Sequence, residues 1–165
     1  MRKTFTTVLV IFALVIAILA TAFGVALAQG PGTTCAVTGG GTIGDSTVRI
    51  GVALKCDVTR APNILNISWG AGNCFHLDTL TQAICTDDPS ISPGRPPCNC
   101  DTYEGWGVGR YNAVDGYQAR WIFTDAGEPG TTDWAWVKVT DAGGTTVLEQ
   151  SGFLRFGNLE FRNSR

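Results

Sequence analysis

The sequence predicts an all-β protein of seven or eight short antiparallel strands, arranged as a sandwich or a barrel. After residue 30, apolar residues recur at every second position in several stretches, and no segment sustains the period of a helix. The 165 residues include 21 glycines and 7 prolines, which suit the turns between such strands. Both observations favour many short strands over a helical or mixed fold.

The N-terminus precedes the strands and predicts an export signal. A positively charged start leads into a long apolar run that ends in Ala26-Leu27-Ala28. This order is typical of a signal peptide, so we expect residues 1–28 to be removed and residues 29–165 to form one domain. An uncleaved anchor is the alternative, because the run is long enough to span a bilayer, and only then would the protein touch a membrane. Either way we expect the domain to be extracellular.

Alternation of apolar and polar residues places the strands. In the first stretch, Ile50, Val52 and Leu54 alternate with polar residues such as Lys55, as a half-buried strand requires. The same pattern predicts strands at 48–58, 65–69, 117–123 and 135–139, the start of one at 75–77, and two short ones within 147–161 around Gly157-Asn158.

Turn sequences separate these strands. The tetrapeptide Thr-Asp-Ala-Gly occurs at 124–127 and again at 140–143, each time where a strand should end. Asp accepts backbone N–H bonds within a turn, and Gly adopts the positive φ that a turn needs. The proline-rich segment 86–97 cannot be a central strand, so we expect a long loop there.

The six cysteines predict disulfides. An even number of cysteines in an exported chain indicates three bridges, with 15 possible connectivities. The cysteines are Cys35, Cys56, Cys74, Cys85, Cys98 and Cys100. A zinc site using Cys98, Cys100 and His76 is the alternative, but C-x-C is not the usual zinc spacing and the compartment is oxidising.

Composition excludes several functions. A net charge of −2 gives no electrostatic basis for binding nucleic acid. With one histidine, a His-based triad could use only His76, and a site with several histidines is impossible within one chain. A lone histidine on a strand is more often a hydrogen-bonded structural residue than a catalyst. We therefore expect no enzyme activity.

Three short motifs resemble the post-COAP domain of secreted bacterial proteins. They are the opening 38–43, the loop 125–133 and the closing stretch from Ser151-Gly152 to residues 157–161. The resemblance covers most of residues 35–162 but not the cysteine- and proline-rich middle. It implies a β-sandwich, disulfide-stapled here, and a non-catalytic role.

Two groups of residues are candidate sites. Asp125, Glu128 and Asp133 offer three carboxylates within nine residues, which suits calcium, although Asp125 could simply build its turn. Trp134 and Trp136 alternate with small and β-branched residues, so we expect both indoles on the outside of the fold. Two rings along one strand face could stack on sugar rings, unless another segment covers them.

These observations predict an exported, non-catalytic module that binds or scaffolds at the cell exterior, with a polysaccharide or an extracellular protein as its partner. One alternative is glycan recognition through Trp134 and Trp136. Another is a small secreted hydrolase with an acid pair that the sequence does not single out. Calcium is the one cofactor that the sequence suggests.

Overall fold

The computed structural model describes residues 34–91 and 100–164, so the predicted signal segment 1–28 lies outside the described residues. Within the described ranges, no helix is long and apolar enough to cross a membrane. The elements are β1 (Cys35–Ile43), β2 (Arg49–Lys55), β3 (Ile64–Trp69), β4 (Asn73–Thr86), β5 (Thr102–Tyr111), β6 (Val114–Thr124), the 3₁₀ helix η1 (Gly130–Thr132), β7 (Trp134–Thr140) and β8 (Thr146–Asn163).

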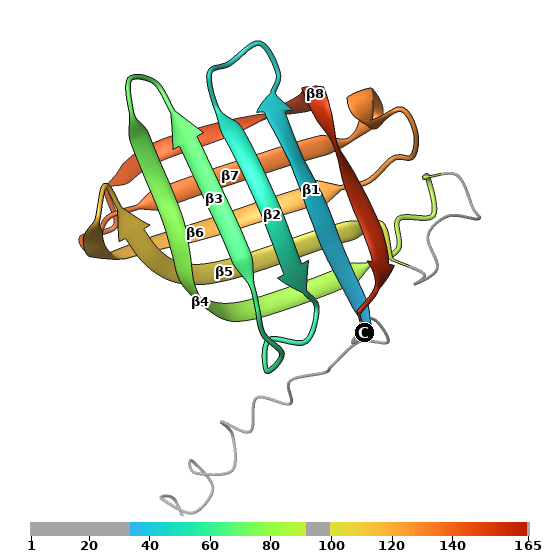
Figure 1. Ribbon diagram of the computed structural model, residues 1–165, viewed down its shortest axis with the longest axis horizontal. Coiled ribbons are helices and arrows are strands. Elements are labelled where there is room, and N and C mark those ends of the chain that lie inside the picture. The colour runs from blue at the N-terminus through green and yellow to red at the C-terminus, as the bar shows by residue number, and fades with distance from the viewer. Residues whose placement is uncertain (1–33, 92–99, 165) are drawn as a thin grey trace, which may run out of the picture.

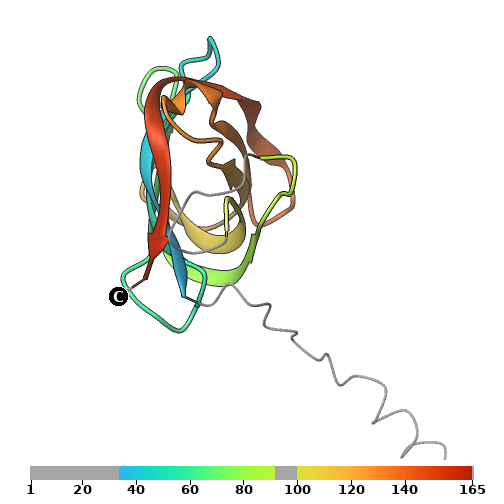
Figure 2. The same cartoon turned by 90° about the vertical axis from the view of Figure 1, so that its right-hand side faces the viewer.

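The eight strands close into one antiparallel barrel (Figures 1 and 2). Each strand pairs with the next in sequence, and β8 pairs back with β1. The all-β, antiparallel class is therefore confirmed, whereas the predicted sandwich is wrong. The physical reason is β8, which is one continuous strand where the sequence predicted two. It pairs with β7 as far as Phe153 and with β1 from Leu154 onward, so a single strand joins both halves of the sheet.

Glycines let β8 and β1 meet closely at this seam. Gly157 has a φ of 110°, and a Cβ atom there would collide with the carbonyl oxygen of Gly40 on β1. Only glycine combines that backbone conformation with so close an approach. Gly157-Asn158, which the sequence suggested as a break between two strands, is instead a contact point inside one strand.

The barrel is flattened, and its two halves cross. Figure 1 shows β1 to β4 in front, running steeply across β5, β6 and β7 behind them. Where β8 turns from the rear half to the front half, it passes the hairpin between β1 and β2. There Arg155 forms an ion pair with Asp45 of the hairpin, with 2.6 Å between Nη1 and Oδ1.

The inside of the barrel is packed with side chains. Trp121 and Tyr103 are fully buried, and their rings stack with centroids 6.5 Å apart. Glycines at alternate positions of β5 make room for them, because a Cβ atom on Gly105 would collide with the indole of Trp121. The other large, fully buried aromatic residues are Phe75, Phe123 and Phe161. A packed interior places any ligand site on the outer surface.

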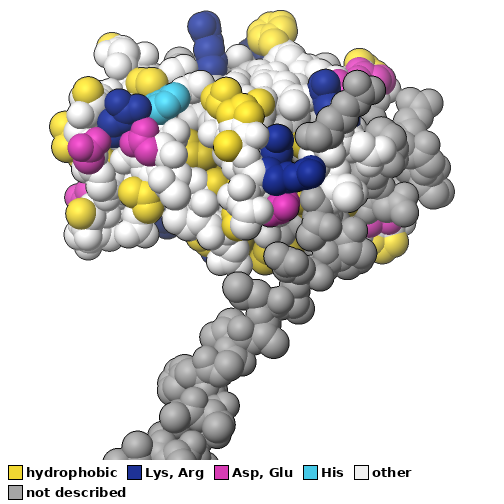
Figure 3. Space-filling view, turned by 60° about the horizontal axis from the view of Figure 1, so that its bottom comes forward, with side chains coloured by type: hydrophobic (Ala, Val, Ile, Leu, Met, Phe, Trp, Pro, Cys, Tyr) yellow, Lys and Arg dark blue, Asp and Glu magenta, His cyan; other side chains and the backbone are white. Residues whose placement is uncertain are grey.

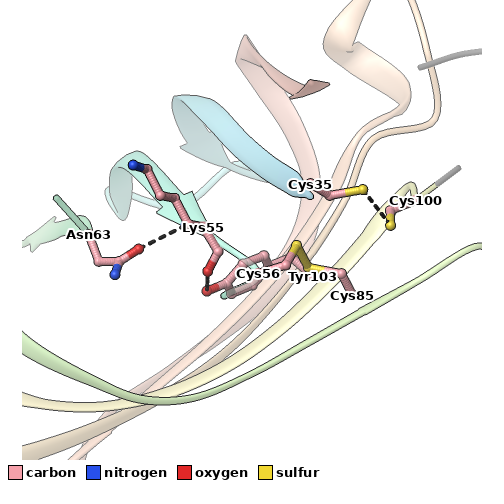
Figure 4. The surroundings of a disulfide bond; sticks show 7 residues. All are labelled: Cys35, Lys55, Cys56, Asn63, Cys85, Cys100 and Tyr103. Carbon is pink, nitrogen blue, oxygen red and sulfur yellow. Dashed lines mark hydrogen bonds between the residues drawn. A yellow bond between two sulfur atoms is a disulfide. The ribbon is translucent and has the colours of Figure 1, made fainter. Parts of the chain in front are cut away.

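One disulfide is present, between Cys56 and Cys85, with 5.9 Å between the two Cα atoms (Figure 4). It closes a loop with a sequence separation of 29 residues, and such a link contributes about 2–4 kcal/mol. Beside it, the Sγ atoms of Cys35 and Cys100 lie 2.7 Å apart. Cys74 is an exposed thiol near the start of β4, whereas Cys85 lies near its end. Of the three predicted bridges, one is thus confirmed; Cys98 lies outside the described residues.

Candidate binding surfaces

The outer surface has a groove of about 520 Å³ beside the hairpins β1–β2 and β3–β4. Its lining mixes aromatic rings, cations and small polar groups. The residues that matter below are Thr42, Arg49, Ser68, Trp69, Arg155 and Phe156. None of the residues lining this groove is Asp or Glu, so the groove brings no acid pair together for glycoside hydrolysis.

Strand register arranges part of this lining in one row across the sheet. Thr42 of β1 is paired on one side with Phe156 of β8 and on the other with Arg49 of β2. Arg49 in turn is paired with Ser68 of β3. Since neighbouring strands are about 4.8 Å apart, the row from Phe156 to Ser68 is about 14 Å long. An extended ligand lying across the strands would meet these four side chains in order.

The guanidinium of Arg49 is unpaired within the described part of the chain. It forms neither an ion pair nor a side-chain hydrogen bond there, and the residue is exposed. The other arginines of the described residues all form ion pairs, and these are Arg60, Arg110, Arg120, Arg155 and Arg162. Arg49 thus presents its full set of N–H donors to the groove.

Trp69 lies at one end of the groove, but its indole is on the inward face of β3 and packs against the core, because it alternates with the outward Ser68. The indole stacks on Tyr111, with ring centroids 5.3 Å apart and 12° between the planes. Tyr111 packs against Tyr117 at 5.0 Å, and its hydroxyl donates to Oδ1 of Asn73 at 2.8 Å. These contacts fix the end of the barrel beside the groove, and the indole is not part of the outward row.

Trp134 and Trp136 lie on the outer face of β7, as the sequence predicted. The alternating residues Ala135, Val137 and Val139 are fully buried, and the two tryptophans are partly buried. Both indoles have large or charged neighbours on this face.

Trp136 is occupied by contacts within the protein. The guanidinium of Arg120 lies over its ring at 5.6 Å and over the ring of Trp106 at 5.1 Å. Arg120 is itself held by Glu104, with Nε 2.9 Å from Oε1. Glu149 also contacts Trp136, and the pKa of Glu149 is lowered by hydrogen bonds from Lys138 and from the Trp136 side chain. Arg120 thus lies over one face of the Trp136 ring, as Arg155 lies over the ring of Phe156 at 5.5 Å.

The three acids proposed as calcium ligands accept hydrogen bonds from the protein. Asp133 is fully buried, and its Oδ1 and Oδ2 accept from the backbone N–H groups of Ala126 and Leu159 at 3.0 and 2.7 Å. Burial raises its pKa to about 6, although these two bonds act in the opposite direction. Glu128 accepts from Nδ2 of Asn158 at 2.7 Å. The bonds from Asn158 and Leu159 join the loop 125–133 to β8. These two residues lie in the part of β8 that follows its pairing with β7.

Asp125 also joins the loop to β8, and in addition it stabilises a turn. Its Oδ1 accepts from the N–H of Gly127 at 2.9 Å, and its Oδ2 accepts from the N–H of Phe161 on β8 at 3.1 Å. In the second copy of the tetrapeptide, Asp141 accepts from Gly143 in the same way at 2.9 Å. Within the described ranges, no group of three or more His, Cys, Asp or Glu residues is arranged to hold a metal ion.

His76 lies on the surface among charged side chains (Figure 3). Its Nδ1 is 2.6 Å from Oδ1 of Asn66 on the neighbouring strand. Beside it lie Cys74 and Arg110, which line a shallow hollow of about 290 Å³. Asp101, next to Cys100, bonds Thr86 at the far end of β4, so His76 and Cys100 of the alternative zinc set lie toward opposite ends of that strand; Cys98 is outside the described residues.

The sequence analysis did not find the groove. Thr42, Arg49 and Ser68 are ordinary outward-facing strand residues, and only the pairing of three strands brings them together. Searches of family models, of curated proteins and of solved structures found no match for the chain. The resemblance to the post-COAP domain therefore stays a prediction.

Proposed function

We propose that the protein is an exported, non-catalytic module that binds a polysaccharide on the outside of its barrel. The observation that carries the proposal is the groove, because its lining combines one exposed ring, that of Phe156, and unused polar groups in one row. Saccharides are bound by this combination: aromatic faces pack on the C–H faces of the sugar, and hydroxyl and cationic groups bond its oxygens.

Two further observations support the proposal. The packed interior leaves the outer surface as the place for a ligand. The Cys56–Cys85 disulfide is compatible with work in an oxidising compartment outside the cytoplasm, as the N-terminal sequence predicts. The resemblance to a domain of secreted bacterial proteins agrees with both.

The partly buried tryptophans of β7 are the competing surface. Trp134 is paired with Phe153, which is 63% exposed, so an aromatic pair is accessible there. We place the ligand in the groove because Arg49 is unpaired within the described residues, whereas the cation beside Trp136, Arg120, is held by Glu104.

Affinity electrophoresis of the oxidised protein in gels containing neutral or acidic polysaccharides tests this proposal. We expect retardation by at least one polysaccharide, and its loss in Phe156→Ala, a side chain that is 66% exposed and not needed for the core. Retardation lost instead in a Trp134→Ala/Trp136→Ala variant would move the site to β7. No retardation in any gel would refute polysaccharide binding. Circular dichroism of each variant checks that the barrel is intact.

A further inference from the structure

We propose that the groove selects acidic polysaccharides, and that Arg49 binds a carboxylate of the sugar. This inference rests on the proposed function and adds the chemical class of the ligand. Its central observation is that Arg49, unlike the other five arginines of the described ranges, forms no ion pair with an acid of those ranges.

The geometry of the row explains why a carboxylate would be bound there. An arginine presents two parallel N–H donors that fit the two oxygens of a carboxylate. Thr42 and Ser68 lie next to Arg49 on the neighbouring strands, and their hydroxyls have no hydrogen-bond partner within the described part of the chain. The two hydroxyls can bond the ring oxygens of a sugar whose carboxylate is held by Arg49.

An exposed aromatic side chain lies at one end of this polar row. Phe156 stands at the β8 end, and the guanidinium of Arg155 lies over its ring at 5.5 Å. Arg155 is in turn held by Asp45, so its charge is partly neutralised at the rim. At the other end of the row, Ser68 is followed by Trp69, whose ring is on the inward face and packs on Tyr111 and the core. A sugar chain lying across β8, β1, β2 and β3 would pack on the ring of Phe156 at the β8 end.

The next row of the sheet leaves space for such a chain. Gly51 of β2 is paired with Gly40 of β1, and a Cβ atom added to Gly51 would meet nothing within 4 Å. The sheet therefore carries no side chains at two adjacent positions beside the polar row. A flat ligand can approach the backbone there, whereas longer side chains would hold it away.

Binding is measured by isothermal titration calorimetry with three probes: polygalacturonate, the same polymer with its carboxyls methyl-esterified, and polyglutamate. Esterification removes the negative charge and keeps the sugar backbone, and polyglutamate keeps the charge and removes the sugar. The variant is Arg49→Gln. Its matched control is Arg162→Gln, which also removes one exposed outer-face arginine but lies away from the groove and pairs with Glu160.

We expect binding to polygalacturonate, weakened about tenfold or more by Arg49→Gln, since one bidentate pair is worth about 1.4 kcal/mol or more. Arg162→Gln should stay within about twofold of the wild type, as a charge distant from the site is screened by salt. If both variants lose affinity for polygalacturonate equally, the inference is wrong and the binding is unspecific electrostatic attraction.

The remaining outcomes separate this inference from the proposed function. Equal binding of the esterified polymer would overturn selection for acids while polysaccharide binding stands. Equal or tighter binding of polyglutamate would overturn the saccharide class and identify acidic peptides as the ligand. A protein that binds none of the three but is retarded by another, neutral polysaccharide loses this inference alone; one that binds no polysaccharide at all loses both proposals.

Discussion

Replacing Trp121 with alanine should lower the free energy of unfolding by about 3–5 kcal/mol, the usual range for truncating a large buried aromatic residue. Trp121 is fully buried at the centre of the barrel, where it stacks on Tyr103. Its indole N–H has no acceptor within the described part of the chain. Trp121→Phe should therefore cost clearly less than Trp121→Ala, because it keeps most of the ring and removes an unsatisfied donor. Urea unfolding followed by circular dichroism measures both.

A double-mutant cycle tests whether position 105 requires glycine because the Trp121 indole leaves no room for a Cβ atom. Gly105→Ala places a Cβ atom against the ring, so it should cost about 1–3 kcal/mol in the wild type. In a Trp121→Leu background the same change should cost much less, because the obstructing ring is gone. If Gly105→Ala costs the same in both backgrounds, the fit between Gly105 and Trp121 described above is wrong.

Asp133→Ala should destabilise the barrel by about 2–6 kcal/mol, since it leaves one buried and one partly buried N–H donor without an acceptor at about 1–3 kcal/mol each. Those donors are the N–H groups of Ala126 and Leu159. The matched control is Asp141→Ala, which removes an exposed carboxylate from the second copy of the turn and should cost about 1 kcal/mol. Equal losses in thermal or urea unfolding would contradict a special bracing role for Asp133.

The same carboxyl gives the stability a pH dependence. Burial raises the pKa of Asp133 from its usual value of 3.8 to about 6, so the native state binds the proton more tightly than the unfolded chain does. Stability relative to Asp133→Asn should therefore rise as the pH falls from about 6 to about 4, by about 2–3 kcal/mol. A constant difference between the two proteins across this window would mean that the pKa is not raised.

The alternation of apolar and polar residues correctly predicted the strands that have one buried and one exposed face. β2, β3, β6 and β7 lie where the sequence placed them, because each buries one face and exposes the other. The outward position of Trp134 and Trp136 follows from the same rule. Both copies of Thr-Asp-Ala-Gly form the expected turn, since the bond from the Asp carboxylate to the glycine N–H is local.

β5 and the closure of the barrel could not be predicted in this way. The inward positions of β5 include Gly105, Gly107 and Gly109, so the strand has no apolar alternation to detect. Its glycines make sense only beside Trp121, which is on the next strand. Closure depends on β1 pairing with β8 from the opposite end of the chain, and no local pattern reports such a pairing.

The candidate site shows the same division between local and long-range information. Asp125, Glu128 and Asp133 were recognised as a cluster, but their hydrogen bonds to β8 depend on long-range packing. The groove depends on it as well, because Arg49 is informative only once every other described arginine is seen to be paired. Whether a hydrogen-bond donor lacks a partner can be read only from the folded molecule.

The central claim is that the ligand binds in the groove across β8, β1, β2 and β3. The most direct test is to record amide chemical shifts by NMR while an oligogalacturonate is added. The account predicts that the shifts concentrate at Thr42, Arg49, Ser68 and Phe156, with little change along β7. Shifts centred on Trp134 and Trp136, or no shifts at a saturating concentration, would contradict it.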